Sequence, residues 1–430
     1  MSSSSGIGTI VRVLSNRTFG IYSASIIVAL TGTLMQRVVS GWLMWQLTES
    51  GAWLGLLAFA DLFPTVLLGP VAGAFADRWD RMRVTKVTQA LALLQALTLL
   101  LLTATGWISA PRLLVLTFLL GIVAAFNQPA RLALTPALVP PSDLPSAVAI
   151  ASMIFNLARF LGPAAAGLVI AAAGIPAAYA VSSASFVVFL AALSFIRVGP
   201  TVAARATRTR FVDDLAAGLR YTASHAGIAI VLLLMIAGNV GARPLIELLP
   251  GFAAQVFHGA AVELAVLTSS AGAGAVLAGL WLSGRGDGTG LAQILVTSTL
   301  VVALSAALFT STDHLFVGAA ILVVTGFALA STGIAAETLI QISVEGAMRG
   351  RVLGIYALLF RGGPALGALF MGVAAEYVGL RLPVFAGAIA VFLVFLWAWF
   401  GLRSTLEKAL AKPDRDLQPD RVPASRAEQT

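Results

Sequence analysis

The chain lacks cysteine altogether and has only three lysines and three histidines among its 430 residues. Without cysteine it can form neither disulfides nor cysteine-bound zinc or iron–sulfur centres. No lysine stands in a G-x-x-x-x-G-K-[ST] phosphate-binding loop, and no H-E-x-x-H or G-x-S-x-G pattern occurs. These absences disfavour an ATP-driven motor and an enzyme, and we expect neither a metal nor another cofactor.

Charged residues are also scarce, at 11%, while hydrophobic residues make up 59%. Soluble proteins average roughly a quarter charged residues. Twelve apolar stretches fill the chain between residues 18 and 402, each near the ~20 residues that a helix needs to cross the hydrocarbon core. The sequence therefore predicts an all-α polytopic membrane protein with twelve transmembrane helices, at 18–46, 52–76, 84–106, 112–135, 146–172, 176–196, 227–252, 262–284, 289–311, 314–340, 351–376 and 379–402.

Basic residues between these stretches indicate how the chain is oriented. Arginine and lysine gather on the cytoplasmic side of membrane proteins, and the net charge of +8 is therefore no signal for nucleic acid. Met1–Arg17 has no short apolar region with a cleavage site, so we expect no removable signal peptide. Both termini are expected inside, because eight basic residues then fall in cytoplasmic loops: Arg78, Arg81, Arg83, Lys86, Arg131, Arg285, Arg349 and Arg351. Only Arg112 and Arg381 lie in loops on the outside.

The longest polar segment divides the crossings six and six. The expected parts are a cytoplasmic N-terminus at 1–17, bundles at 18–196 and 227–402, a cytoplasmic linker at 197–226 and a tail at 403–430. The charged, proline-bearing tail is expected to be disordered. Within the linker, residues 210–225 have the pattern of an amphipathic helix lying on the membrane. A plain solvated linker remains the alternative interpretation.

The two halves resemble each other in sequence. Three matches occur in the same order: Gly32…Arg37 with Gly238…Arg243, Gly73 with Gly279, and Gly162-Pro163 with Gly363-Pro364. Parallel six-helix repeats are the plan of one large transporter fold, in which substrate binds near the midplane between the halves. The matches predict two pseudo-symmetric halves. The Gly-Pro pairs are candidate hinges, since proline disturbs a helix, or sites of tight packing.

The loop after the second stretch reads Gly73-Ala-Phe-Ala-Asp77-Arg78-Trp-Asp80-Arg81-Met-Arg83. It resembles the signature loop of the major facilitator superfamily, G-x-x-x-D-R-x-x-R-x-R/K. A glycine there lets two helices approach closely, and arginines bond to helix ends. The resemblance implies a latch that closes the cytoplasmic side in the outward-open state.

Further segments are similar to the exporter branch of that superfamily that includes enterobactin-type siderophore exporters and drug pumps. They are Met35-Gln36 with Trp42, Leu47-Thr48, Leu138-Val139-Pro140, and Asn156…Arg159…Gly162-Pro163…Gly167. The last is similar to the fifth-helix antiporter motif, with Ala158 where glycine is usual. The fourth-helix arginine of many proton antiporters would fall near Thr117 and is absent, so that mode of coupling is not implied. The resemblance implies a monomeric transporter of the bacterial inner membrane.

Four ionisable residues lie in the outer halves of predicted crossings: Arg37, Asp61, Arg243 and Glu247. Charges within a membrane are costly and indicate function by default. Arg37 and Asp61 lie at similar depth, and Arg243 and Glu247 stand four residues apart on one helix face. We expect one cluster, in which Asp61 or Glu247 exchanges a proton. Static ion pairs between helices are the alternative.

Polar residues deeper in the crossings are candidates to line a substrate cavity: Gln36, Asn127, Gln128, Asn156, Arg159, Asn239 and Arg361. Four intramembrane arginines against two carboxylates leave the interior positive, which suits an anionic substrate. The competing interpretation is that Arg159 and Arg361 bond carbonyls near the Gly-Pro pairs.

These features predict a secondary active exporter of an amphipathic, anionic small molecule, which works by alternating access in exchange for protons. Its expected partners are that molecule, protons and the lipid bilayer, and not nucleic acid. An importer or facilitator of a polar solute, and a receptor or lipid-handling protein that transports nothing, remain alternatives on the same fold.

Overall fold

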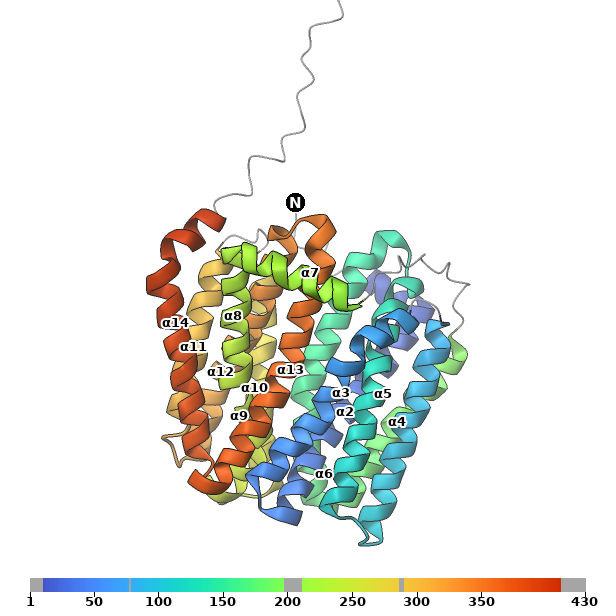
Figure 1. The fold of residues 1–430 in the computed structure, drawn as a ribbon. Helices are drawn as coiled ribbons and strands as arrows, with labels where there is room; N and C mark the ends of the chain where they lie inside the picture. The colour runs from blue at the N-terminus through green and yellow to red at the C-terminus, as the bar shows by residue number, and fades with distance from the viewer. Residues whose placement is uncertain (1–10, 77–78, 197–210, 286–289, 411–430) are drawn as a thin grey trace, which may run out of the picture.

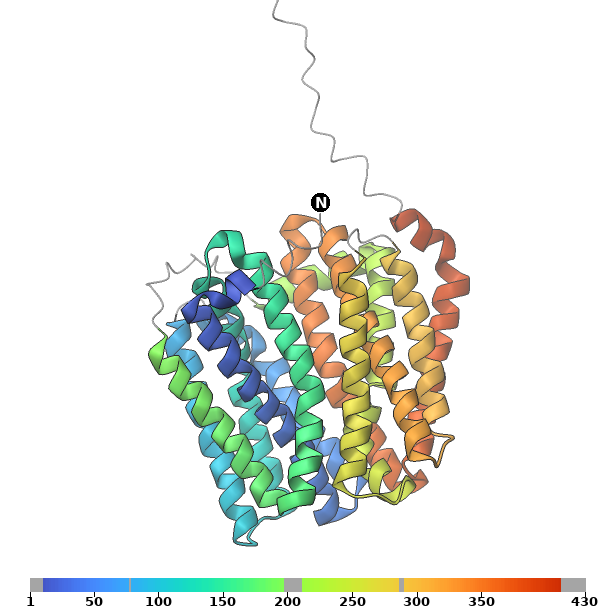
Figure 2. The same cartoon turned by 180° about the vertical axis from the view of Figure 1, so that it is seen from behind.

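The computed structural model describes residues 11–76, 79–196, 211–285 and 290–410. Within these residues the chain is a bundle of long helices without strands (Figure 1). Eleven helical segments are long and apolar enough to cross a membrane. One of them, Pro141–Phe195, has 55 residues and contains a non-helical Gly174 with φ of 83°. Its two arms run antiparallel and meet at this glycine (Figure 2), so the predicted fold of twelve crossings is confirmed.

The first half contains five long helices: α2 (Arg17–Thr48), α3 (Gly51–Ala76), α4 (Arg81–Ala104), α5 (Ala110–Leu134) and α6 (Leu144–Phe195). The short turns η1 (Thr135–Leu138) and η2 (Pro141–Asp143) join α5 to α6. Asparagine and aspartate start two of the helices. The Asn16 side chain accepts from the amides of Thr18 and Phe19, and Asp80 caps α4 in the same way.

The second half repeats the plan with α8 (Ala226–Gly241), α9 (Pro244–Gly251), η3 (Phe252–Val256), α10 (Ala261–Ser283), α11 (Leu291–Phe309), α12 (Leu315–Ser343), α13 (Gly346–Val378) and α14 (Arg381–Leu410). Two expectations need correction. The crossing predicted at 227–252 is divided into α8, α9 and the π-turn η3, because Pro244 offers no amide to continue the helix. Helix α14 continues to Leu410, beyond the predicted end at 402. The tail from 411 lies outside the described residues.

The linker contains a helix, α7 (Phe211–Ser224), but its apolar residues Leu215 and Tyr221 contact the protein, so it is neither a plain linker nor a helix with these residues turned to the membrane. It lies across the face of the bundle where α2 begins and α14 ends (Figure 1). We call this the terminal face and the opposite one the far face. Leu215 and Tyr221 pack on the core of the second half, and Arg351 of α13 pairs with Asp214 at 2.8 Å. The linker helix is therefore tied to α13.

The sequence repeat is also present in the packing. A Cβ on Gly162 of α6 would lie 2.7 Å from Leu34 Cβ of α2, and one on Gly363 of α13 would lie 3.0 Å from Asn239 Cβ of α8. Non-helical dihedrals within α6 occur at Gly174 only, so this helix continues through Pro163. Tight packing therefore accounts for both glycines, and a hinge at Pro163 or Pro364 remains a prediction.

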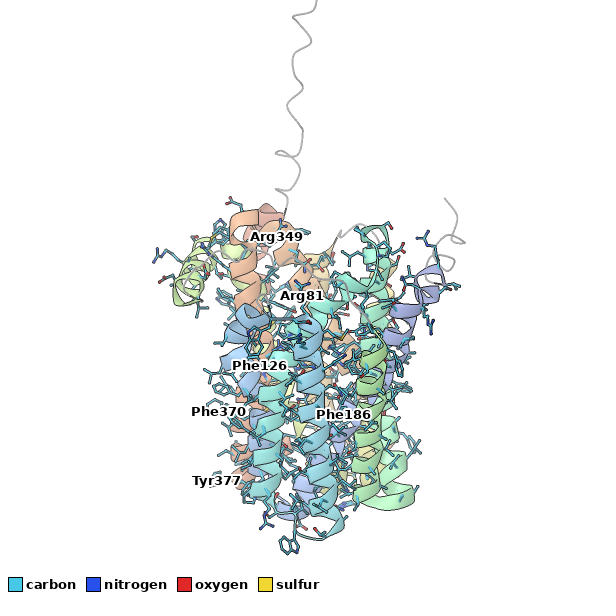
Figure 3. The ribbon with its side chains drawn as sticks, turned by 90° about the vertical axis from the view of Figure 1, so that its right-hand side faces the viewer. Arg81, Phe126, Phe186, Arg349, Phe370 and Tyr377 are labelled. Carbon is cyan, nitrogen blue, oxygen red and sulfur yellow. The ribbon has the colours of Figure 1, made fainter. Side chains whose placement is uncertain are left out.

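The halves share a hydrophobic core only toward the far face. There, Met35 and Trp45 of α2 belong to one buried cluster with Leu248 of α9, Phe252 of η3 and Met371 of α13. Toward the terminal face each half has its own cluster. Figure 3 marks the two ends of α13, with Tyr377 at the far face and Arg349 at the terminal face.

Helices α3 and α13 also contact each other most closely toward the far face. Near the far face their backbones touch, because a Cβ on Gly55 would lie 2.3 Å from the Ala368 carbonyl oxygen. Toward the terminal face, a Cβ on Gly69, Gly73 or Gly354 would have no atom within 4 Å. The closest contacts between α3 and α13 therefore lie toward the far face, whereas these three glycines toward the terminal face have no close neighbour.

Candidate functional site

An arginine joins the two halves at the centre of the molecule. Arg37 of α2 lies 3.1 Å from Asp61 of α3 through Nε and 3.2 Å from Glu247 of α9 through a terminal nitrogen. All three side chains are half-buried. One guanidinium therefore binds a carboxylate of its own half and a carboxylate of the other. Charge-assisted bonds of this kind are the stronger hydrogen bonds in proteins.

The expected cluster of two arginines and two carboxylates forms in part, since Arg37 binds both carboxylates. The Arg243 guanidinium lies over the Phe360 ring, 4.8 Å from its centroid, and no ion pair within 4 Å joins it to a described carboxylate. Arg243 is the N-cap of α9, with helical φ and ψ of −58° and −32°, and Glu247 is in the first turn of the same helix. Their spacing is therefore helical, and the two side chains differ in direction, toward Phe360 and toward Arg37.

Two further arginines approach the interface between the halves. Arg361 of α13 donates to the Gln128 side-chain oxygen on α5, a second link across the halves. Arg159 of α6 has neither a hydrogen bond nor an ion pair with any described residue. The expected bonding of Arg159 and Arg361 to carbonyls near the Gly-Pro pairs does not occur among these residues. With Arg37 and Arg243 there are four arginines against two carboxylates, a net charge of +2.

Two predicted cavity residues serve their own half instead. Gln36 is 2% exposed and donates to Gln95 of α4 at 2.7 Å, so it belongs to the first half's interior rather than to a cavity. Asn127 donates to Thr88 of α4 at 2.7 Å. Asn156 donates to the carbonyl of Ser152 at 3.0 Å and faces the second half, because a Cβ on Gly279 of α10 would lie 3.5 Å from its Nδ2. A long apolar stretch gives no sign of which face is turned toward the other half, so the sequence could not separate Gln36 and Asn127 from the arginines.

The signature loop is described in part, since Asp77 and Arg78 lie outside the described residues. Arg81 donates to the carbonyl of Ala133 at 3.1 Å, near the end of α5, as expected of an arginine that binds a helix end. Arg83 is exposed and lies 3.8 Å from Asp80. The close approach of two helices expected at Gly73 is absent, because a Cβ there would have no atom within 4 Å.

One link at the far face was not predicted. Glu376 of α13 accepts from the Ser50 hydroxyl at 2.5 Å and from the Ala52 amide at 2.9 Å, at the first turn of α3. A carboxylate there satisfies amides that a helix start leaves free. Ser50 before the helix was a possible sequence signal for a cap, but nothing in the sequence indicated a carboxylate from the other half. No group of acidic and histidine residues suited to a metal occurs in the described chain.

Comparisons with known proteins agree with this geometry. A family model described as transmembrane secretion effector matches residues 10–425. The staphyloferrin A transporter of Staphylococcus aureus is 30% identical over 152 residues, which span 35% of this chain and only 38% of that protein. The enterobactin exporter of Escherichia coli is 25% identical over 307 residues, 70% of this chain and 72% of the exporter. A solved bacterial homologue of the lysosomal transporter Spinster, inward-facing and occupied, superposes with a TM-score of 0.72 over 90% of this chain and 97% of its own, at 15% identity.

Proposed function

Because the chain belongs to the transmembrane secretion effector family of the major facilitator transporters, we propose that it exports an amphipathic, anionic small molecule. As a transporter of this family, it is a multi-pass membrane protein and not an enzyme. Two of its relatives are named for siderophores, as the enterobactin exporter and the staphyloferrin A transporter. They support a siderophore-like or drug-like substrate for this chain.

The observation that carries the proposal is the set of central arginines without acidic partners. Arg159 has no partner among the described residues, Arg243 rests on an aromatic ring, and Arg361 bonds only an amide. Removing a cation from water costs free energy unless an anion or dipoles replace the water. A carboxylate or catecholate substrate supplies that anion, and the planar guanidinium holds it at two points.

The orientation supports export. Arg81, Arg83, Arg349 and Arg351 lie toward the terminal face, which supports a cytoplasmic assignment for that face. We therefore assign the conformation, in which the halves share a core toward the far face, as inward-facing. In the proposed cycle, substrate enters this state from the cytoplasm between α3 and α13, and closure at the terminal face moves the opening to the far side.

Proton exchange is assigned to the Arg37 cluster. When a proton binds Asp61 or Glu247, that carboxylate loses its charge and its attraction for Arg37 weakens. Since Glu247 is on the other half, its neutralisation weakens the link between the halves and favours their separation at the far face. For exchange, a proton from outside binds the carboxylate while the pair with Arg37 is broken, and it leaves to the cytoplasm when the pair forms again, which stabilises the inward-facing state. A static ion pair would leave transport independent of the pH gradient.

Export is tested in inside-out vesicles whose membranes contain the wild-type protein, the Arg159→Gln variant or the Arg243→Gln variant. Uptake of 2,3-dihydroxybenzoate into vesicles with an acidic lumen supports export, and the two variants should take up at least tenfold less. Arg112→Gln is the matched control, because this arginine is exposed and bonds a loop carbonyl at the far face. Equal uptake by the Arg159 and Arg243 variants contradicts the proposal, and movement only in right-side-out vesicles indicates an importer.

A further inference from the structure

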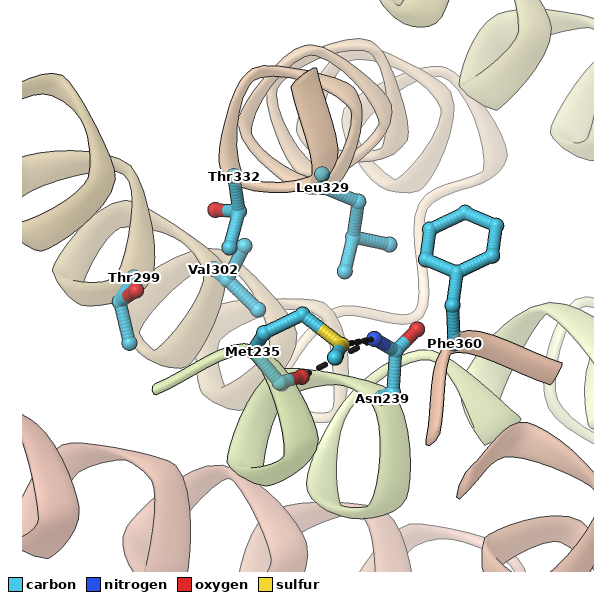
Figure 4. A pocket seen from close by; sticks show the side chains of 9 residues that line it. Met235, Asn239, Thr299, Val302, Leu329, Thr332 and Phe360 are labelled. Atoms are coloured by element: carbon cyan, nitrogen blue, oxygen red, sulfur yellow. Dashed lines mark hydrogen bonds between the residues drawn. The ribbon is translucent and has the colours of Figure 1, made fainter. Parts of the chain in front are cut away.

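A small recess lies within the second half, bounded by α8, α11, α12 and α13. Its polar lining comes from Asn239, Thr299 and Thr332, and its apolar lining includes Met235 and Phe360 (Figure 4). The three polar residues are 6%, 1% and 5% exposed. The free volume of about 10 Å³ is room for one water-sized group.

Every polar side chain of this recess has already used its donor. The Thr299 hydroxyl donates to the Leu295 carbonyl at 2.8 Å, and the Thr332 hydroxyl to the Ala328 carbonyl at 2.9 Å. Asn239 Nδ2 donates to the Met235 carbonyl at 3.0 Å and contacts its sulfur. A carbonyl only accepts, so the carboxamide nitrogen must face Met235.

The oxygen of Asn239 is therefore turned away from Met235, toward Phe360 (Figure 4). No described residue donates a hydrogen bond to this oxygen. The polar lining of the recess therefore presents oxygen acceptors and no free donor. A group that brings a hydrogen can donate to these oxygens, whereas a carboxylate, which only accepts, cannot.

The recess lies next to one of the central arginines. Arg243 follows Asn239 by four residues, and its guanidinium covers the ring of Phe360, which lines the recess. An anion held by Arg243 is thus beside an acceptor site of hydroxyl size. The positive charge of Arg243 makes the alternative occupant, a metal cation, unfavourable there.

We propose that this recess binds a hydroxyl group of the substrate, which is therefore an acid that also carries a hydroxyl donor close to its anionic group. The anionic group of the substrate rests on the proposed function, and the hydroxyl group is the new inference. In the absence of substrate a water molecule occupies the recess, and the substrate hydroxyl replaces it. Asn239 Oδ1 accepts the hydroxyl hydrogen, and the two threonine oxygens are further acceptors.

The proposal is tested by titrating the purified protein in detergent with benzoate, the three monohydroxybenzoates, benzamide and 3-hydroxybenzamide. Comparing the affinities of acids and amides tests whether an anion is preferred, as the proposed function requires. Comparing hydroxylated compounds with those that lack a hydroxyl tests the recess. Either proposal can therefore fail without the other. At least one hydroxybenzoate is expected to bind about fivefold tighter than benzoate. If none binds more tightly than benzoate, the recess holds an ordered water only and the proposal is wrong.

A threonine in the lining provides the decisive variants. Thr332→Val keeps the size of the side chain and replaces a lining hydroxyl by a methyl group, so it should bind benzoate as wild type does and reduce the preference for the hydroxylated compound. Thr332→Ser keeps the hydroxyl and should retain the preference. Thr338→Val, at a more exposed position of the same helix, is the control and should keep the preference as well. Unchanged preference in Thr332→Val overturns the proposal.

Discussion

Arg37 is the residue on which the two halves meet, and its position could be predicted only in part. Its depth matched that of Asp61, and this pairing is present at 3.1 Å. Glu247 was placed in the same cluster from its helical spacing to Arg243, and it pairs with Arg37 of the other half. Spacing along one helix indicates which side chains share a face, but not which residue of another helix they meet.

Neutralising the carboxylates of this cluster is predicted to separate proton coupling from substrate movement. Asp61→Asn and Glu247→Gln keep the shape of the side chain and remove its charge. Each variant should lose pH-driven accumulation while exchange of labelled for unlabelled substrate persists. Both activities are measured in the same proteoliposomes. Full dependence on the pH gradient in both variants would show that the coupling site lies elsewhere.

Arg361 is predicted to contribute to anion binding through its fixed position beside Gln128. A hydrogen bond to a charged group contributes roughly 1.5–3 kcal/mol, so Arg361→Gln should weaken binding of an anionic ligand by about tenfold or more. Arg361→Lys should restore only part of the affinity, because lysine lacks the planar fork. Titration of each variant with benzoate and with benzamide measures its affinity for the anion and for the neutral analogue. Wild-type affinity for benzoate in Arg361→Gln would make this arginine structural.

At the scale of the elements, the helices were predictable because their apolar length is set by the bilayer. The break at Gly174 falls between the predicted crossings 146–172 and 176–196, as expected. The division of the seventh crossing was missed, since hydropathy is high on both sides of Pro244, where α8 gives way to α9. Contacts between helices were not predictable beyond the glycines, whose lack of a side chain permits close approach.

The close contact of Gly162 with α2 is predicted to stabilise the fold, and a hinge at Pro163 is a separate prediction. The Cβ position of Gly162 lies 2.7 Å from Leu34 Cβ and 3.0 Å from the Met35 amide nitrogen. Overpacking of this kind costs about 1–3 kcal/mol, so Gly162→Ala should lower the thermal unfolding temperature. Gly69→Ala, with no atom within 4 Å, should leave it unchanged or raise it. Equal stability of the two variants would contradict the packing account.

The contact of α13 with the first turn of α3 is predicted to hold the far face closed. Glu376→Gln weakens the acceptor at Ser50 and Ala52, while Glu376→Ala removes it. A spin-label pair placed on the far-face ends of α3 and α13 should then report more of the separated population, in the order Ala above Gln above wild type. Identical distance distributions in all three proteins would show that the carboxylate does not stabilise closure.

At the scale of the whole molecule, the two-half plan was predictable from the repeated Gly-Arg and Gly-Pro positions. Their packing repeats as well, with Gly162 against α2 and Gly363 against α8. The conformation was not predictable, because all states of alternating access use the same residues. In this conformation the halves share a core toward the far face and have separate cores toward the terminal face.

The latch loop is predicted to act on this whole-molecule change and not on substrate choice. Arg81 binds the carbonyl of Ala133, far from the central arginines. Arg81→Ala should lower the turnover rate several-fold, with little change in the affinity for an anionic ligand. Initial rates in proteoliposomes and equilibrium titrations measure the two quantities separately. A large selective change in affinity with normal turnover would contradict this role.

The central claim is that the unpaired arginines move an anion outward. It is tested most directly by accumulation of 2,3-dihydroxybenzoate and its neutral amide in inside-out vesicles with an acidic lumen. The account predicts that the acid accumulates above its external concentration, that a protonophore abolishes this, and that Arg159→Gln with Arg243→Gln removes it. Equal accumulation of acid and amide, or an unaffected double variant, would contradict the account.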